Sequence, residues 1–498
     1  MKKIFSIAGL CAAFLIVTIN ARAQYSQYLD DALRYSTPGL GVSARSLGMG
    51  TAYTGVANDF SAVFSNPAGL GQMRMSEVTL GMSNVSYGNT STFFNSSQSL
   101  TNSSTSLNNL GLVYSLPVQQ GSLVLAVGFG READYTSGLS FQGYNPGTNP
   151  VSSIVQMWAP NNQTLSQYES IAEQLYLAVA DTITNKFVSP INGKLTQSGT
   201  VLESGGQNYV TVSGAIEASK NFYIGATLNF ISGSYSYVRN YQEEDLANVY
   251  TRANTVTLYN NNKDTTVFDL NYLTSDQTLE HDISGFSMKL GMLYKFGPGS
   301  RLGIAIKTPS WITVHETYSE QASSTFDNGD HYALPASSSN YDYDIASPYV
   351  FSAGLSHSIG DLMLAGDVEY TDWTQMQFSN ASAELMSLNT TFKTEFRPTV
   401  NYRLGGEYEF SSVGFRLRGG FAYLPSPYNG DPSSFAQKYI TGGLGFIIAD
   451  AFSIDIGYAH GYWDTKHAQL WDINGNPTAE TTEKISTDNL IGTISYRF

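Results

Sequence analysis

Several long segments of this chain alternate between apolar and polar residues, and this period of two restricts the possible folds more than any other feature. In the segment 401–410, N-Y-R-L-G-G-E-Y-E-F, the tyrosines, the leucine and the phenylalanine share one face, while Arg403, Glu407 and Glu409 share the other. Such alternation predicts β-strands with one apolar and one polar face. The pattern recurs in segments 361–370, 413–423 and 452–458.

The length of these segments and the composition favour a transmembrane β-barrel over a water-soluble β-sandwich. Strands of soluble sandwiches run about 5–6 residues, whereas these segments approach the ten or so residues that cross a bilayer at a tilt. Charged residues make up 13% of the chain, against about 25% in a typical soluble domain, and aromatic residues also reach 13%. The sequence therefore predicts an all-β transmembrane antiparallel barrel that is apolar outside and polar inside.

The first 23 residues predict a secretory signal peptide. Lys2 and Lys3 precede an uncharged apolar stretch, 4–19, and the tripeptide A-R-A at 21–23 matches the small-x-small pattern of a cleavage site. A membrane anchor is the alternative, but sixteen apolar residues fall short of the ~20 that a spanning helix needs. We therefore expect the mature chain to begin at Gln24.

Charge and cysteine usage exclude several classes of function. Loss of Lys2, Lys3 and Arg22 with the leader reduces the 26 basic residues to 23 and leaves all 41 acidic ones, a net charge of −18. This balance argues against a nucleic-acid partner, which calls for clustered Lys and Arg. The one cysteine of the chain, Cys11, lies in the leader, so the mature protein has neither a disulfide nor a cysteine metal site.

About fourteen alternating segments can be counted, and an even number returns both chain ends to one side of a bacterial barrel, the periplasm. The connections alternate between short and long, as expected if the long ones are external loops. The strands are predicted to begin near residues 76, 108, 121, 207, 221, 283, 300, 348, 361, 399, 412, 438, 451 and 486. Short turns are predicted at 117–122, 219–221, 297–300, 360 and 411–412, and long loops at 90–107, 138–206, 243–282, 319–347 and 375–396.

The chain ends in I-S-Y-R-F, with Ile494, Tyr496 and Phe498 on one face. An apolar alternation that closes on a terminal phenylalanine resembles the assembly signal of outer-membrane barrels. Tyr496 and Phe498 are therefore the predicted signal for the barrel assembly machinery, and the outer membrane of a Gram-negative bacterium is the predicted location.

A glycine-rich segment precedes the first predicted strand. It reads G-M-G-T-A-Y-T-G-V-A-N-D-F-S-A-V-F-S-N-P-A-G-L over residues 48–70, and its N-P-A triplet resembles the characteristic motif of the FadL/TodX family, outer-membrane transporters of long-chain fatty acids and aromatic hydrocarbons. The segment D-V-E-Y-T-D-W at 367–373 and the strand pair around 402–423 extend the resemblance over essentially the whole mature chain. It implies three parts: a signal peptide at 1–23, an N-terminal hatch at 24–75 and a barrel of about 14 strands at 76–498.

In that family the N-terminal segment folds into the barrel as a hatch, or plug, and these residues suit such a role. Glycine tolerates close approach and unusual dihedral angles, while proline fixes its own φ and favours an extended conformation in the residue before it. An ordinary turn is the alternative; a phosphate-binding loop is not favoured, because the glycines do not form G-x-G-x-x-G. The predicted hatch motif consists of Gly48, Gly50, Asn66, Pro67, Ala68 and Gly69.

The third predicted strand, 123–135, should place Gly128 and Gly130 on the face opposite Phe129. Glycines inside a strand weaken pairing and mark bulges or bends. In the family, a kink in this strand opens a lateral hole in the barrel wall, and Gly128, Phe129 and Gly130 are predicted to form that kink. The alternative is that the glycines give room for packing against the hatch.

The longest predicted loop contains apolar residues at helical spacing, Ile171, Leu175 and Val179, within the segment 165–183. This spacing predicts an amphipathic helix over the barrel mouth, which together with residues 155–158 would line a groove for a hydrophobic ligand. The alternative is that the helix buries one face only in order to fold.

No catalytic constellation is evident, because the six histidines are scattered and neither H-E-x-x-H nor a nucleophile elbow occurs. The segment 472–483, D-I-N-G-N-P-T-A-E-T-T-E, has oxygen ligands at positions one, three, five, nine and twelve of a calcium loop. Pro477, however, occupies position six, where that loop needs glycine. We therefore predict neither an enzyme nor a cofactor or metal site.

These features predict passive uptake of hydrophobic small molecules such as long-chain fatty acids, by external capture, hatch movement and lateral release into the bilayer. An energised receptor would need about 22 strands and a larger plug, although haem or another apolar nutrient remains an alternative ligand. A structural or adhesive barrel is a further alternative, but it would not need a hatch. Hydrophobic ligands, outer-membrane lipids and the assembly machinery are the expected partners, and we expect a monomer.

Overall fold

The computed structural model describes residues 21–159, 170–181, 184–253, 255–258, 264–267, 269–449, 451–472 and 475–498. The first twenty residues of the predicted signal peptide lie outside this range, and residues 21–23 belong to the first helix, α1 (Ala21–Ser36). Within the described ranges, every helix is too short or too polar to cross a membrane.

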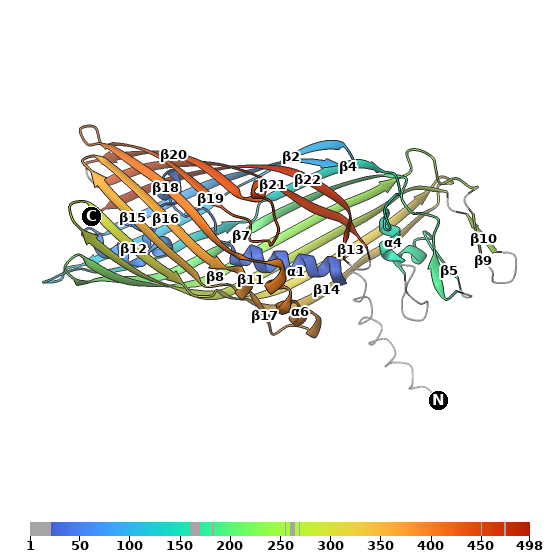
Figure 1. Ribbon diagram of the computed structural model, residues 1–498, viewed down its shortest axis with the longest axis horizontal. Helices are drawn as coiled ribbons and strands as arrows, with labels where there is room; N and C mark the ends of the chain where they lie inside the picture. Colours follow the sequence, from blue (N-terminus) through green and yellow to red (C-terminus); the bar gives the residue numbers. More distant parts are fainter. Residues whose placement is uncertain are drawn as a thin grey trace, which may run out of the picture.

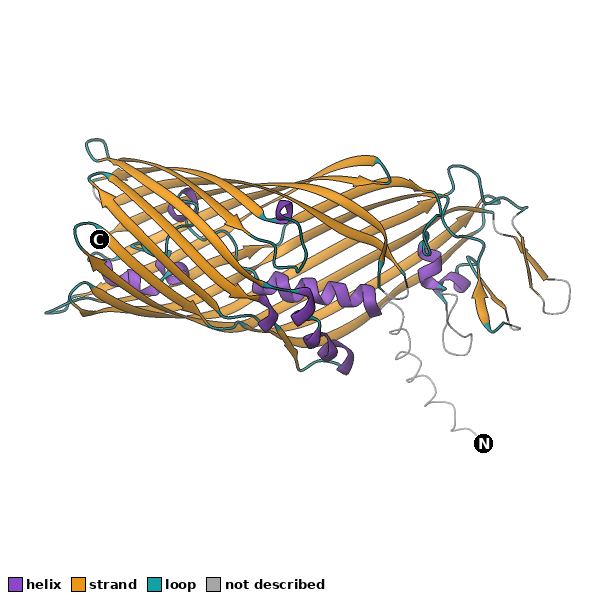
Figure 2. Ribbon diagram, in the orientation of Figure 1, coloured by secondary structure: helices purple, strands orange, loops and turns teal. Residues whose placement is uncertain are grey.

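Long strands dominate the chain and tilt around a common axis (Figures 1 and 2). Residues of alternating character form them, because side chains on a strand point to opposite faces in turn. The wall strands are β1 (Glu77–Phe93), β2 (Ser96–Leu116), β3 (Leu123–Asp134), β4 (Ser137–Asn145), β7 (Leu195–Ser219), β8 (Phe222–Glu244), β11 (Leu270–Phe296), β12 (Ser300–Lys307), β13 (Trp311–Phe326), β14 (His331–Ala346), β15 (Val350–Ile359), β16 (Leu362–Asp372), β17 (Gln377–Ser379), β18 (Pro398–Phe410), β19 (Phe415–Leu424), β20 (Gln437–Ile448), β21 (Phe452–Trp471) and β22 (Pro477–Arg497).

These strands close into one antiparallel barrel. The sheet has 18 strands, but β3 and β4, β12 and β13, β14 and β15, and β16 and β17 each follow one another in a single position of the wall, which leaves fourteen positions. The last strand, β22, pairs with β1 from Glu77↔Arg497 to Thr92↔Thr482. The predicted fourteen-stranded barrel is confirmed.

One end of the barrel carries the short turns and the C-terminus, and we call it the short-turn end (Figure 1). The turns after β2, β7, β11, β15 and β18 lie where the sequence predicts them, and Asn221 (φ 65°) and Gly360 (φ 58°) supply the left-handed conformation of tight turns. Phe498 and Ser76 exchange backbone hydrogen bonds of 3.0 Å, so the last residue completes the seam between β22 and β1.

The outer face of the barrel is apolar over the half that adjoins the short turns. In β1, for example, Val78, Leu80 and Met82 are exposed, whereas the outward positions beyond them are Asn, Ser, Gly and Thr. Tyr496 and Phe498 are 51% and 55% exposed. Their rings stack with centroids 6.0 Å apart, at the margin of this band that adjoins the short turns. An apolar band with aromatic margins is the surface that a bilayer requires.

The opposite, long-loop end differs from the prediction because two segments expected as loops are strands. Residues 90–107 belong to β1, a two-residue turn and β2, and residues 319–347 fall mainly in β13 and β14. Their serine, threonine and asparagine side chains are polar on both faces, so an apolar alternation does not reveal them. They pair nonetheless: Thr90 and Ser99 form a side-chain hydrogen bond of 3.1 Å across the ladder.

The remaining connections at this end are true loops. The longest spans 146–194 rather than 138–206, since β4 and β7 extend into it, and the next spans 245–269. The loops contain α4 (Ile154–Trp158), α5 (Ile171–Gln174), β5 (Val179–Asp181), β6 (Lys186–Val188), β9 (Thr255–Leu258), β10 (Asp264–Val267), η5 (Trp373–Gln375), α6 (Ala383–Ser387), η6 (Leu388–Thr390), α7 (Phe392–Glu395) and η7 (Ser433–Phe435).

The N-terminal segment lies inside the barrel. Helix α1, which we call the lumen helix, contacts inward-facing side chains of β8, β11 and β14. The segment 42–72, which we call the hatch floor, fills the lumen towards the short-turn end with α2 (Ala44–Gly48), α3 (Ala62–Ser65) and η3 (Pro67–Gln72). Figure 2 shows the short helices of the hatch floor behind the front strands, near the short-turn end, and the lumen helix as the longest helix of the picture.

Candidate functional site

The Asn66-Pro67-Ala68 triplet forms the corner between α3 and η3. Asn66 is extended (φ −147°, ψ 102°), Pro67 is the first residue of η3, and the Asn66 carboxamide oxygen accepts a hydrogen bond of 3.2 Å from the Ala68 N–H. The Asn66 Nδ2 donates to the carbonyl oxygens of Thr54 (2.9 Å) and Met292 (3.0 Å). One buried side chain therefore ties the corner both to the hatch floor and to the wall.

Glycines on both sides let the hatch floor approach the wall backbone. Gly50 has φ +63°, and a Cβ there would lie 2.6 Å from the Leu404 carbonyl oxygen. A Cβ on Gly48 would lie 3.0 Å from the Cα of Gly443 in the wall. Within the floor itself, a Cβ on Gly69 would lie only 1.9 Å from the Ala57 carbonyl oxygen. Close backbone packing of this kind is what glycine permits.

A buried ion-pair network, which the sequence did not predict, also fixes the hatch floor. Arg45 of α2 donates to both carboxylate oxygens of Glu407, each at 2.8 Å, and to Asn58 Oδ1 at 2.7 Å. Arg418 donates from Nε to the same carboxylate at 2.7 Å and pairs with Asp455 at 2.6 Å. Bidentate Arg–carboxylate geometry fixes orientation as well as distance.

The lumen helix is held by tyrosines and titratable groups instead. Tyr428 donates a hydrogen bond to Asp30, and Arg34 pairs with Asp31. Tyr35 contacts His281 through its hydroxyl group. Burial raises the pKa of both Asp30 and Asp31 above the usual aspartate value. The sequence offered one signal for this helix, a polar stretch before the glycine-rich segment, but nothing that identified its partners.

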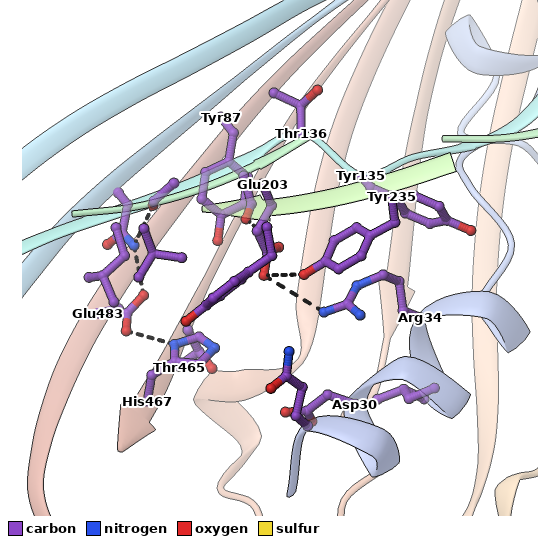
Figure 3. A pocket seen from close by; sticks show the side chains of 18 of the residues that line it. Asp30, Arg34, Tyr87, Tyr135, Thr136, Glu203, Tyr235, Thr465, His467 and Glu483 are labelled. Atoms are coloured by element: carbon purple, nitrogen blue, oxygen red, sulfur yellow. Dashed lines mark hydrogen bonds and ion pairs between the residues drawn. The ribbon is translucent and has the colours of Figure 1, made fainter. Parts of the chain in front are cut away.

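A cavity of about 860 Å³ lies beside the lumen helix. Figure 3 shows Arg34 and Tyr235 both pointing to Glu203, with distances of 3.7 Å and 2.9 Å, while His467 faces Glu483 at 2.7 Å. Aromatic side chains, among them Tyr87, Tyr237 and Trp463, line the same cavity. The cavity therefore offers apolar faces together with polar groups that are already paired.

The backbone ladder between β2 and β3 ends at Asn109↔Gly130. Beyond this point β3 stays paired with β7, with a register shift between Arg131 and Ala133, and no described residue of β2 pairs with β4. Side-chain hydrogen bonds bridge the gap instead: Ser104 of β2 donates to Asp134, the last residue of β3, at 3.1 Å, and Asn102 of β2 donates to the Ser137 carbonyl oxygen of β4 at 2.8 Å. The wall is thus discontinuous one residue beyond the predicted Gly128-Phe129-Gly130 kink.

The two glycines of this strand also face the hatch floor. A Cβ on Gly128 would lie 2.4 Å from the Phe60 ring, and one on Gly130 would lie 2.2 Å from the Phe64 ring. Phe129 points to the opposite face, as alternation requires. The glycines therefore give the hatch room, as the second interpretation expects. Gly128, Phe129 and Gly130 are themselves paired with both β2 and β7, so their role as a kink stays a prediction.

The segment 39–42 of the N-terminal region lies on the inner side of this discontinuity. Gly39 donates a backbone hydrogen bond to the Glu132 carbonyl oxygen (2.9 Å), and Asn108 of β2 donates to the Val42 carbonyl oxygen (2.8 Å). Gly39 also lines the cavity. The same short segment therefore touches both edges of the break and the cavity behind it.

The prediction of one amphipathic helix over residues 165–183 is wrong for the residues of this segment that the structure describes. Helix α5 ends at Gln174, because Tyr176 has φ +58° and Val179 begins strand β5; residues 165–169, 182 and 183 lie outside the described residues. Val155, Trp158 and Leu175 are buried in one apolar cluster with rim residues of the barrel. This loop mainly buries itself against the rim.

The segment 472–483 does not gather its oxygen ligands in the part that the structure describes. Residues 473 and 474 lie outside that part, and Pro477 begins β22. Glu480 pairs with Lys466 at 3.2 Å, and Glu483 pairs with His467. Because β22 covers the second half of the segment, Glu480 and Glu483 lie on opposite faces of a strand and bind different partners. They therefore do not converge on one ion.

Comparison with known proteins agrees with this architecture. Residues 39–498 match the family described as outer membrane protein transport protein (OMPP1/FadL/TodX). No curated protein matches the chain. Among solved structures, the P. putida toluene transporter TodX is similar at 13% identity and a TM-score of 0.53, with 92% of this chain and 99% of that chain covered. A Pseudomonas aeruginosa FadL homologue is similar at 12% identity and a TM-score of 0.55, with 93% and 99% covered.

Proposed function

Because this chain belongs to the FadL/TodX family of outer-membrane transport proteins, we propose that it takes up hydrophobic small molecules, such as long-chain fatty acids, by passive lateral release into the bilayer. The outer membrane of a Gram-negative bacterium is its location, and a transporter rather than an enzyme is what the family provides. The predicted recognition, location and fold are confirmed by these comparisons. The ligand and the route belong to the proposal.

The observation that carries the proposal is the end of the β2–β3 ladder at Asn109↔Gly130, next to the cavity. An acyl chain gains ~0.8 kcal/mol for each CH₂ that leaves water, so a ligand in the lumen needs a path to the bilayer rather than an energy source. The break offers such a path through the wall. The segment 39–42 closes its inner side, so release requires this segment to move.

The experiment locks the break and measures uptake. The mature chain has no cysteine, so a S104C/D134C pair can be joined across the break by a short thiol-reactive cross-linker. The native side chains lie 3.1 Å apart, and joining them should reduce uptake of a labelled long-chain fatty acid into cells or proteoliposomes at least about tenfold. Ligand binding in detergent should persist.

The matched control is a T274C/S323C pair. These side chains lie 2.8 Å apart on β11 and β13, whose backbone ladder is continuous around them, so a cross-link there should leave uptake unchanged. Normal uptake by the locked S104C/D134C protein would refute lateral release at this break. Equal loss in both locked variants would mean that the barrel must flex as a whole, which also contradicts the proposal.

A further inference from the structure

Three side chains from distant parts of the chain meet where the lumen helix touches the wall. Asp31 comes from α1, His281 from β11 and Glu316 from β13, and one potential ligand atom of each lies within 4.8 Å of the others. Their residues are 0%, 1% and 3% exposed. His281 and Glu316 are directly paired across the β11–β13 ladder, so two of the three positions are fixed by the wall.

Tyrosines orient each of these groups. The Tyr35 hydroxyl group contacts His281 Nδ1, which leaves Nε2 facing Glu316 at 3.2 Å. Tyr28 donates to Glu316 Oε1 at 3.2 Å and so leaves the other carboxylate oxygen towards the cluster. Outer partners that hold a histidine ring and a carboxylate in this way are typical of protein metal sites.

The two carboxylates of this cluster share few cationic partners. Asp31 and Glu316 are buried carboxylates, and the Tyr343 hydroxyl group lies 3.5 Å from an oxygen of each. Arg34 pairs with Asp31 but is shared with Glu203 at 3.7 Å, and no Lys or Arg among the described residues forms an ion pair with Glu316. Besides Arg34, His281 is the one basic side chain that pairs with them among the described residues, so two buried carboxylates this close favour a bound cation.

We propose that Asp31, His281 and Glu316 bind one divalent transition-metal ion of the Zn²⁺, Co²⁺ or Mn²⁺ type. One imidazole nitrogen and two carboxylate oxygens suit these ions, whereas Mg²⁺ and Ca²⁺ prefer oxygen ligands alone. The ion places positive charge between the two carboxylates and joins the lumen helix to two wall strands. If the metal also controls movement of the hatch, that role rests on the proposed function. Binding of the metal ion does not depend on it.

Metal binding can be tested without transport. Full-length protein in detergent, treated with a chelator and then freed of it, is titrated with Co²⁺, and the visible absorption of the bound ion is recorded. We expect one tightly bound Co²⁺ per chain, displaced by Zn²⁺. D31N and H281Q should abolish the band, and Y35F should weaken Co²⁺ binding about 10–100-fold, the usual effect of losing an outer partner.

H315Q is the matched control. His315 Nδ1 lies 2.7 Å from Asp342, but both side chains are exposed and offer only two ligands.

D31N alters only the lumen helix, so it keeps the test valid if H281Q fails to assemble. Absence of tight Co²⁺ binding by the wild type, or equal binding by wild type and D31N, would overturn the site. Loss of the band in H315Q alone would assign the ion to the surface and overturn it as well. If the cross-linked S104C/D134C protein takes up fatty acid normally but the wild type binds Co²⁺ tightly, the proposed function is refuted and the metal site is supported.

Discussion

The hatch floor and the lumen helix occupy the same barrel but are attached to it by different interactions. The hatch floor is joined to the wall by backbone contacts at glycines and by the bidentate Arg45–Glu407 pair. The lumen helix is joined by side chains instead: Tyr28, Ala32 and Tyr35 pack against wall residues, and polar contacts such as Tyr428–Asp30 and Tyr35–His281 add to this packing. The floor thus meets the wall backbone to backbone, whereas every contact of the helix named here is made by side chains. The comparison indicates a fixed floor and a releasable helix.

The largest effect should come from the ion-pair network of the floor. E407Q removes the carboxylate that Arg45 and Arg418 share and leaves Arg45 only the more distant carboxylate of Asp59, at 3.7 Å, a change in a buried position that costs about 3–5 kcal/mol. We expect a large drop in the midpoint of heat-induced unfolding, followed by gel migration. E409Q is the control, since its pair with Arg416 is 20% and 35% exposed and is worth about 0–1 kcal/mol. Equal midpoints for the two variants would show that the floor does not depend on this network.

The corner motif should come next. N66A removes three hydrogen bonds of a fully buried side chain and should destabilise the floor by about 1–3 kcal/mol, and N66A/P67A should also make it sensitive to added protease. The control is N84A, an exposed asparagine that donates to Ser104 and Thr105 on the outer wall. Unchanged protease sensitivity and unchanged uptake in the double variant would show that the Asn66-Pro67 corner does not hold the hatch floor in place.

Adjacent glycines of β19 offer a sharper test of the floor. A Cβ on Gly420 would lie 2.3 Å from the Gly50 amide nitrogen, whereas a Cβ on Gly419 meets nothing within 4 Å. G420A should therefore destabilise the protein by about 1–3 kcal/mol through overpacking, while G419A should not. Both variants are compared by the same unfolding midpoint. Similar midpoints would mean that the floor can move away from the wall at little cost.

The sequence revealed the parts of this molecule that obey a period or a local motif. The bilayer imposes apolar alternation on the wall, so all fourteen strand positions could be counted, and N-P-A marked a local turn. Beyond the apolar band that constraint ends, and the extensions of predicted strands, such as those around Thr90 in β1 and Ser99 in β2, escaped detection. Arg45 and Glu407 lie 362 positions apart, and each is an ordinary lumen charge until the fold joins them. The cluster of Asp31, His281 and Glu316 escaped for the same reason.

The smallest effect should be confined to the lumen helix. Y428F removes the hydrogen bond to Asp30 and should weaken docking of the helix by about 1 kcal/mol, which raises its undocked fraction roughly fivefold. Cleavage of the helix by an added protease should accelerate accordingly, while the unfolding midpoint of the barrel stays constant. Y458F is the control, because Tyr458 donates to Asp488 on the exposed outer face at 2.5 Å. A parallel fall in the barrel midpoint of Y428F would show that helix and floor unfold as one unit, and the distinction between them would not hold.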